Sequence, residues 1–169
     1  QDLDYQTDLS QKIIGGYAQN MSDVPANFFD SMTLHCSFEH FQGAADSEFV
    51  REVDRVLSTI GACLIIPLYL DSEPKIFFDP TRVGPREMEN FDQEARLMAT
   101  HGYFQDHGRY YSPESLAARV LAHLPKTLSA SLIRFDYDPV ENRQLYVRFA
   151  LVLHRENSVF STAYLQESI

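Results

Sequence analysis

Residues 27–70 constrain the fold of this chain most strongly, because they combine strand, helix and strand signals in one uninterrupted run. Residues 28–35 are mostly apolar and are followed by polar side chains, which predicts a buried strand. Residues 46–57 open with helix-capping residue types and carry apolar side chains three and four positions apart, which predicts a helix. Gly61 is expected to stop this helix, and the apolar residues 62–70 predict a second buried strand. The stretch therefore predicts a β-α-β unit with parallel strands and a right-handed crossover.

Length and composition predict one globular domain spanning residues 1–169. The chain is 44% hydrophobic and holds 12 Phe and 9 Tyr, enough to bury a sizeable core. Its formal net charge of −10 disfavours binding to nucleic acids or anionic membranes. No apolar run approaches the roughly 20 residues that span a bilayer, and the first residues lack the order of a signal peptide. We expect a soluble, cytoplasmic protein.

The two cysteines are predicted to be buried free thiols. Cys36 lies near the end of the first predicted strand and Cys63 near the start of the next. In a parallel pair this places them several residues apart, beyond the reach of a disulfide. Free thiols fit a reducing compartment.

The segments before and after residues 27–70 complete the predicted order. Residues 1–5 have the pattern of a strand end, and residues 12–18 that of a short strand interrupted by two glycines. Residues 71–111 form a long, proline-containing insert of weak periodicity, within which residues 85–100 are compatible with a helix. A helix with a serine cap and a proline in its first turn is predicted from Ser112 to its end at Pro125.

The last predicted elements are two β-rich runs at residues 128–137 and 144–154. A polar gap the size of a turn separates them, at residues 138–142. This pattern predicts an antiparallel hairpin. A mostly parallel sheet closed by an antiparallel strand is the fold pattern that results.

At this point the sequence resembles a known family. Phe29-Asp30 opens a strand, Glu39-His40 follows it, and residues 52–57 (EVDRVL) lead to Gly61 and an apolar strand. Together with the final hairpin, these features resemble the carboxyl-terminal two thirds of a class I S-adenosylmethionine-dependent methyltransferase. In that family the helix commonly reads E-x-x-R-V-L-x-x-G-G, and this chain departs from the pattern at Ile60, where glycine is usual.

The resemblance spans residues 2–154 and implies an α/β fold with a Rossmann-like methyltransferase sheet. That sheet would be mostly parallel with an antiparallel final strand, in a three-layer α/β/α arrangement with residues 71–111 as a variable insert. The family's glycine-rich loop has no counterpart here, because Gly15-Gly16 lies inside a predicted strand with no helix after it. We therefore expect the first strand, the loop and the first helix to precede Gln1.

The resemblance implies S-adenosyl-L-methionine as the cofactor, bound beyond the carboxyl ends of the strands. Acidic side chains at the end of the second strand of the family would bind the ribose, and a backbone N–H and side-chain amides after the third would meet the adenine. The fourth strand would lie along the methionine part. In this order the predicted cofactor-binding residues are Asp2 and Asp4; Ala18, Gln19 and Asn20; and Leu34, His35 and Cys36. The alternatives are solvated acids for the first pair and a backbone-bonded histidine for His35.

The remaining candidates are catalytic and substrate-binding residues. His40, beside Glu39, is a candidate general base, with packing at the turn as the alternative. A substrate-binding group at the end of the insert is also predicted, with an aromatic hinge that packs the insert on the sheet as the alternative; it consists of Arg109, Tyr110 and Tyr111. His101 and His107 lack the further ligands of a metal site, so no metal is expected.

Three functional hypotheses follow. The first is methyl transfer to a small-molecule acceptor by direct in-line displacement, in which the protein mainly positions the reactants. The second is a catalytically inactive methyltransferase-like domain that acts as a binding or scaffold module and self-associates, as a homo-oligomer, through an open sheet edge. The third is another Rossmann-type nucleotide enzyme, which the closing hairpin and the missing dinucleotide fingerprint disfavour.

Overall fold

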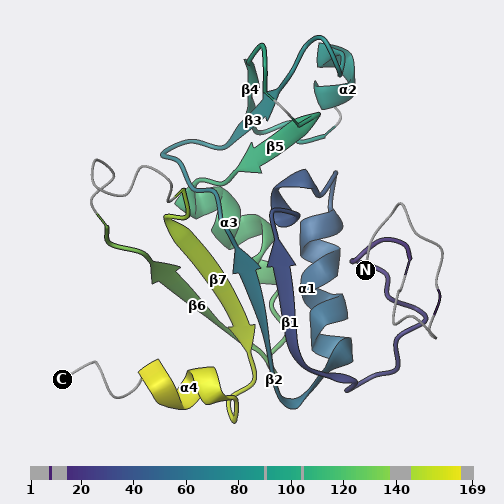
Figure 1. The fold of residues 1–169 in the computed structure, drawn as a ribbon, viewed down its shortest axis with the longest axis vertical. Coiled ribbons are helices and arrows are strands. Elements are labelled where there is room, and N and C mark those ends of the chain that lie inside the picture. The colour runs from purple at the N-terminus through teal and green to yellow at the C-terminus, as the bar shows by residue number, and fades with distance from the viewer. Residues whose placement is uncertain (1–7, 9–14, 90, 104, 138–145, 165–169) are drawn as a thin grey trace.

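The computed structural model describes residues 8, 15–89, 91–103, 105–137 and 146–164. Figure 1 shows a four-stranded sheet flanked by helices and, beyond one end of it, a smaller three-stranded sheet. In this part of the chain, no helix has the length and apolar character needed to cross a membrane.

The predicted β-α-β unit is confirmed. Strand β1 (Phe29–His35) leads through helix α1 (Ala45–Val56) to strand β2 (Leu57–Ile66), and the two strands pair in parallel. The apolar stripe of α1 is buried against the sheet through Phe49, Val50, Val53 and Val56. The three- and four-residue spacing in the sequence therefore identified the face of the helix that builds the core.

The boundary between α1 and β2 differs from the prediction. The helix ends at Val56 and Leu57 already has extended backbone, so Gly61 lies inside β2 instead of ending the helix. The register with β1 shifts between Phe29 and Ser31, which accommodates extra residues of β2 in a bulge. At its other end β2 stops before Pro67, whose nitrogen cannot donate a ladder hydrogen bond.

The second half of the chain contains the predicted helix and hairpin. Helix α3 (Pro113–Arg119) is capped by Ser112, which forms a reciprocal capping box with Ser115, and a 3-10 helix, η3 (Leu121–His123), follows. Strands β6 (Ser129–Arg134) and β7 (Phe149–His154) pair antiparallel.

The final strand lies inside the sheet. Strand β7 sits between β2 and β6 and is antiparallel to both, in the strand order β1-β2-β7-β6. The predicted antiparallel final strand is therefore confirmed.

The α/β class with a central sheet is also confirmed, and one predicted detail differs, because the sheet is mostly antiparallel. Only the β1–β2 pair of the large sheet is parallel among the described residues, because the last strand inserts between β2 and β6. Helices α1 and α3 pack on the same face, where the Ser47 hydroxyl donates to the Arg119 carbonyl at 2.6 Å. One apolar cluster joins both helices to the sheet. The three-layer α/β/α arrangement stays a prediction.

The insert is a folded unit and not an irregular loop. Strands β3 (Lys75–Phe78), β4 (Arg96–Ala99) and β5 (His107–Tyr110) form the small sheet in the order β4-β3-β5. With helix α2 (Pro85–Glu89) they enclose a separate core, which consists of Ile76, Phe78, Met88 and Phe91. The helix suggested for residues 85–100 is limited to α2, because β4 pairs in parallel with β3.

The remaining segments lie after β7 and before β1. A short helix, α4 (Val159–Tyr164), follows β7. The strand predicted at residues 1–5 and most of the one at 12–18 lie outside the described residues. Within residues 15–18, Gly15 forms a single bridge and no strand follows it.

Candidate functional site

A cleft of about 910 Å³ lies along strand β1, on the side away from β2. Its walls come from β1 itself, from the start of α1, from the segment that precedes β1, and from residues just before β5. Among the residues that line it are Tyr17, Ala18, Gln19, Phe29, Ser31, Thr33, Leu34, Cys36, His40, Phe41 and Gln105. The lining of the cleft therefore combines apolar and polar side chains.

Helix α1 holds the segment before β1 in place. Glu52 accepts a hydrogen bond from the Met21 N–H at 2.7 Å, and Arg55 donates to the carbonyls of Met21 and Val24, both at 2.7 Å. The same two side chains bind each other, and this bond is the main reason why the pKa of Glu52 is lowered. The Glu52–Arg55 pair, noted above as part of a family pattern, thus fixes one wall of the cleft.

The cleft brings together several of the predicted cofactor-binding residues. Ala18, Gln19, Leu34 and Cys36 line it, whereas Asn20 and His35 are not among its lining residues. Asp2 and Asp4 lie outside the described residues. Cys36 is half-buried and has a positive φ of 49°, which directs the chain out of β1 into the turn.

His40, the predicted general base, also lines the cleft. It belongs to a 3-10 helix, η2 (Phe38–His40), that begins just after Cys36. Its Nδ1 lies 2.5 Å from the carbonyl oxygen of His107, which can only accept a hydrogen bond. This contact places the proton on Nδ1 and leaves Nε2 as the basic nitrogen.

Glu39 lies next to His40 and is buried, at 6% exposure. Its Oε1 is 3.7 Å from Nε2 of His40, and its Oε2 has no hydrogen-bond partner within the described part of the chain. Burial raises the pKa of the Glu39 carboxyl above its ordinary value of 4.5, against the opposing effect of its backbone and of His40. The Glu39 carboxyl therefore holds its proton more tightly than an exposed glutamate does.

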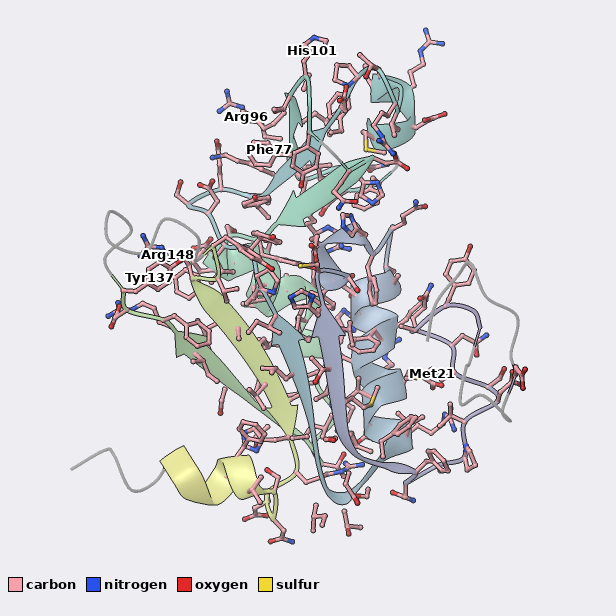
Figure 2. The ribbon with its side chains drawn as sticks, viewed as in Figure 1. Met21, Phe77, Arg96, His101, Tyr137 and Arg148 are labelled. Atoms are coloured by element: carbon pink, nitrogen blue, oxygen red, sulfur yellow. The ribbon has the colours of Figure 1, made fainter. Side chains whose placement is uncertain are left out.

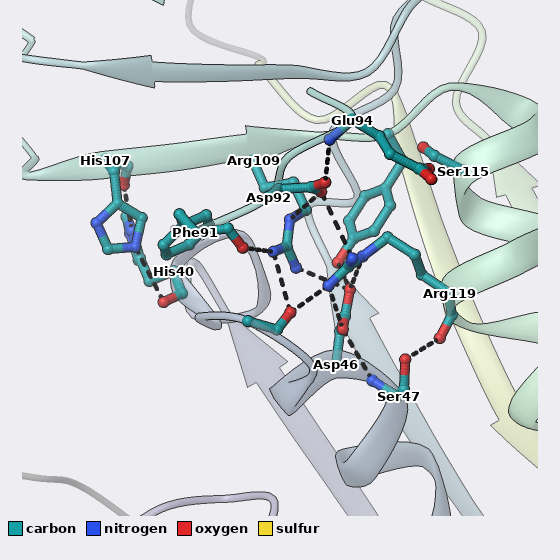
Figure 3. Close-up of polar contacts among 12 residues, drawn as sticks. His40, Asp46, Ser47, Phe91, Asp92, Glu94, His107, Arg109, Ser115 and Arg119 are labelled. Carbon is teal, nitrogen blue, oxygen red and sulfur yellow. Dashed lines mark hydrogen bonds and ion pairs between the residues drawn. The ribbon is translucent and has the colours of Figure 1, made fainter. Parts of the chain in front are cut away.

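Arg109 and Tyr111 do not face a substrate. Figure 3 shows the Arg109 guanidinium directed at Asp46 of α1, with an Nη1–Oδ2 distance of 2.8 Å. Both partners are buried, at 1% and 0% exposure of their side chains. The Tyr111 hydroxyl donates to the same carboxylate at 2.9 Å, and Arg119 of α3 binds it from the other side at 2.8 Å.

This cluster corrects the prediction for Arg109 and Tyr111. Asp92 of the insert completes it, 3.4 Å from Nε of Arg109 and 3.6 Å from Nη1 of Arg119. Arg109 is buried, with Nη1 bonded to the Asp46 carboxylate and Nη2 to backbone carbonyls. It therefore anchors the insert to α1, which is the hinge alternative. The cluster, here named the Asp46 network, consists of Asp46, Asp92, Arg109, Tyr111 and Arg119.

Tyr110, the third predicted substrate-binding residue, points elsewhere. Its ring is half-buried and packs 4.8 Å, centroid to centroid, from both Tyr69 and Phe77. Neighbouring strand residues face opposite sides of a sheet, so Tyr110 and its neighbours Arg109 and Tyr111 necessarily diverge.

The sequence did not identify Asp46 as the centre of a buried network. Asp46 has the residue type of a helix cap, but the cap position is Ala44 and the Asp46 carboxylate turns inward. The aromatic surroundings of Glu39 were missed as well. Spacing within one segment could not reveal either feature. The partners of Asp46 are more than 60 positions away in the chain, and the aromatic residues that the Glu39 charge affects are 30 or more positions from it.

No group of three or more His, Cys, Asp and Glu side chains is placed to hold a metal ion among the described residues. His107, one of the two histidines considered for a metal, donates from Nε2 to the His40 carbonyl at 3.1 Å. Burial lowers its pKa, which favours the neutral ring.

No protein-family model and no curated protein matches this chain. Among solved structures, a protein from Pyrococcus horikoshii is similar to it, with 17% identity and a TM-score of 0.47 over 84% of this chain and 58% of that one. A SAM-dependent methyltransferase from Thermotoga maritima has 13% identity and a TM-score of 0.44 over 84% and 62%. Another, from Methanosarcina mazei, has 12% identity and a TM-score of 0.43 over 85% and 70%. The chain thus spans about three fifths of the length of the first two, and methyltransferases are among the structures that it resembles.

Proposed function

We propose that this chain takes part in S-adenosylmethionine-dependent methyl transfer to a small-molecule acceptor. The observation that carries the proposal is the cleft along β1. Residues predicted from the sequence as cofactor contacts come from two separate segments and line this one cleft: Ala18 and Gln19, and Leu34 and Cys36. SAM-dependent methyltransferases are among the solved structures that are similar to this chain.

The lining suits the chemical character of the cofactor. A volume of about 910 Å³ is in the range of small-molecule sites. Apolar contacts with an adenosyl group would come from Phe29 and Leu34, and hydrogen bonds to its polar edges from Gln19, Ser31 and the backbone of Ala18.

When bound, the cofactor supplies an electrophilic methyl group. The residues of this chain would then position the acceptor in line and exclude water. His40, with Nε2 as its basic nitrogen, would take a proton from an acceptor that must lose one, and Glu39 would stabilise the charged imidazole.

One structural feature favours the alternative of a non-catalytic module. Strand β1 lies at an edge of the large sheet as far as the chain is described, and its Ser31 and Thr33 side chains are exposed. An open edge can accept a strand from a second copy or from another protein. A homo-oligomer formed in this way would cover the cleft.

Calorimetric titration with S-adenosylmethionine and its demethylated product tests the proposal. Both the 169-residue chain and the complete gene product should be titrated, because cofactor contacts from further residues would appear only in the second. We expect binding by at least the complete product. Absence of binding by both forms would refute the methyltransferase proposal.

A pair of variants locates the binding. Ser31→Trp places a large side chain in the cleft, whereas Ser129→Trp places it on β6, at the opposite edge of the same sheet. We expect Ser31→Trp to weaken cofactor binding at least about tenfold, equal to about 1.4 kcal/mol. Ser129→Trp should leave it unchanged, and equal effects of the two would argue against the cleft.

A further inference from the structure

A group of aromatic rings packs together where the segment after β2 meets the small sheet. Tyr69 follows β2, and Phe77 and Tyr110 come from β3 and β5 of the insert; Figure 2 shows Phe77 on the small sheet. The Phe77 ring is also 6.2 Å from the ring of Tyr103. This tyrosine cluster, defined as Tyr69, Phe77, Tyr103 and Tyr110, presents half-buried aromatic faces.

A glycine in β5 makes room for one of these rings. A Cβ atom at Gly108 would lie 2.1 Å from the hydroxyl oxygen of Tyr103 and 3.3 Å from Cζ. Any side chain at this position would therefore displace the Tyr103 ring. Gly108 allows the ring to lie directly over the β5 backbone.

Glu39 lies in η2, which packs against β5. The Nδ1 of His40 binds the His107 carbonyl at 2.5 Å, and the Nε2 of His107 binds the His40 carbonyl at 3.1 Å. Burial is the main cause of the raised pKa values of Tyr69, Tyr103 and Tyr110, and the Glu39 charge raises all three further. One oxygen of the same carboxyl, Oε2, is buried without a hydrogen-bond partner among the described residues. A buried acceptor of this kind is costly to leave unpaired, so its presence beside aromatic faces points to a missing donor.

The cluster and the cleft are connected through strand β5. His40 lines the cleft, and its Nδ1 binds the carbonyl oxygen of His107 at 2.5 Å. His107 begins β5, the strand that carries Tyr110. A molecule seated on the tyrosine cluster would thus lie next to the end of the cleft.

We infer that the tyrosine cluster and Glu39 form an acceptor subsite for a small molecule carrying a protonated amine. The inference rests on the proposed function and names the class of its substrate. Aromatic faces attract a cation, and the unpartnered Glu39 oxygen supplies both an opposite charge and a hydrogen-bond acceptor. The three N–H donors of an ammonium group match this set.

The charge of the surrounding residues agrees with a cationic ligand and not with an anionic one. Arg109, on the same strand as Tyr110, is held by Asp46 and Asp92 and so offers no charge to an anion. The chain carries a formal net charge of −10. This excess of negative charge raises the local concentration of cations.

The protonation of Glu39 depends on the groups that face it. A bound ammonium ion favours the carboxylate, because it replaces the partner that the buried oxygen lacks. Binding should therefore release a proton from Glu39 over the pH range in which the free protein keeps it protonated. The titratable groups that act on or receive the charge of Glu39 are His35, His40, Tyr69, Tyr103, Tyr110 and Tyr146.

Equilibrium titration with matched amines and alcohols tests the inference. The probes are methylamine, butylamine and 2-phenylethylamine, each beside the alcohol of the same carbon skeleton. Binding is followed by tyrosine fluorescence, which no tryptophan obscures because the chain has none. We expect at least one amine to bind, and to bind about tenfold or more tightly than its alcohol. The inference is overturned if every amine binds no better than its alcohol.

Variants identify the residues responsible. Glu39→Gln keeps the shape of the side chain and removes its charge, and should weaken amine binding about tenfold or more. Glu48→Gln makes the same change at an exposed position on α1 and should have no effect. Gly108→Ala is the second test, because it displaces Tyr103 without altering Glu39, and it should also weaken binding. Unchanged amine binding in both Glu39→Gln and Gly108→Ala would refute the subsite.

The cofactor titration is run on the same samples to separate the two proposals. Cofactor binding without amine binding would overturn the amine subsite and leave methyl transfer intact. Amine binding without cofactor binding would support the subsite and count against methyl transfer.

Discussion

At the scale of single residues, Asp46 has a large structural role that was not predicted from the sequence. One buried carboxylate binds Arg109, Arg119 and Tyr111, which come from β5, α3 and the segment between them. The residue also accepts a hydrogen bond from the Ser47 N–H. Every polar atom of the Asp46 carboxylate is therefore used, and its charge is balanced inside the protein.

We predict that Asp46→Asn destabilises the protein strongly. The substitution leaves two arginines with only the more distant Asp92 carboxylate as counter-charge. Removing one partner of a buried ion pair costs about 3 kcal/mol or more. Denaturant unfolding measures the loss. Glu48→Gln on the exposed side of the same helix should change stability by less than about 0.5 kcal/mol. A loss as small as this for Asp46→Asn would contradict the structural role of the network.

Glu39 predicts a pH effect of definite sign. Its pKa in the folded state lies above the ordinary value of 4.5, so the folded protein holds this proton more tightly than the unfolded chain. The resulting stabilisation is complete below about pH 4.5 and is lost as the pH rises through the folded-state pKa. Removing this titration with Glu39→Gln should therefore benefit stability more at pH 8 than at pH 4.

Urea unfolding of the native and Glu39→Gln proteins at several pH values checks this expectation. The difference in unfolding free energy between the two should move in favour of the variant as the pH rises. A difference that stays constant from pH 4 to pH 8 would show that the Glu39 pKa is not raised by folding.

The sequence predicted residues of the cleft better than it predicted residues of the Asp46 network. Leu34 and Cys36 could be placed because the end of a buried strand is visible from local polarity. The inward turn of Asp46 could not, because its cause is a pair of arginines 63 and 73 positions away. Local pattern gives the position of a side chain, whereas its partners depend on the whole fold.

At the scale of elements, the junction of α1 and β2 depends on Gly61. A Cβ atom there would lie 2.9 Å from the Phe29 carbonyl oxygen and 3.0 Å from a methyl carbon of Leu57. The sequence correctly marked this glycine as special but assigned it to the end of a helix. Its actual role is the close approach of two neighbouring strands.

We therefore expect Gly61→Ala to destabilise the protein by about 1–3 kcal/mol, the usual cost of overpacking. The midpoint of denaturant unfolding measures the effect. Gly43→Ala does not provide a matched control, because its φ of 54° adds backbone strain. Gly84→Ala does, since no atom lies within 4 Å of the new Cβ. Equal effects at positions 61 and 84 would exclude the close-contact explanation.

The short strands of the insert were not predicted from the sequence. Its strands β3, β4 and β5 each have four residues, too short for a period to stand out from composition. By contrast, the twelve residues of α1 display more than three turns of an apolar stripe. Length alone explains why the β-α-β unit was predicted and the small sheet was not.

At the scale of the whole molecule, two cores are joined by buried charges. The large sheet and the insert have separate apolar clusters, and the Asp46 network connects α1 and α3 to the small sheet. Apolar contacts hold each part together, whereas ion pairs and hydrogen bonds determine how the parts meet.

Hydrogen exchange should reveal this division. We predict that amides of β2 and β7 exchange most slowly and that β3, β4 and β5 exchange through smaller opening reactions. Asp46→Asn should accelerate exchange in the small sheet more than in β2 and β7. Exchange monitored by mass spectrometry resolves these segments. Equal acceleration in both sheets would show that the molecule opens as a single unit.

The position of the Asp46 carboxylate also has a consequence for protein engineering. The carboxylate is a fixed binding point on α1 for the Arg109 side chain of β5. A foreign loop or small domain that delivers an arginine to this point would meet the same partners on α1 and α3. The segment between β2 and α3 could thus be exchanged for one that recognises another ligand, with the large sheet retained as the scaffold.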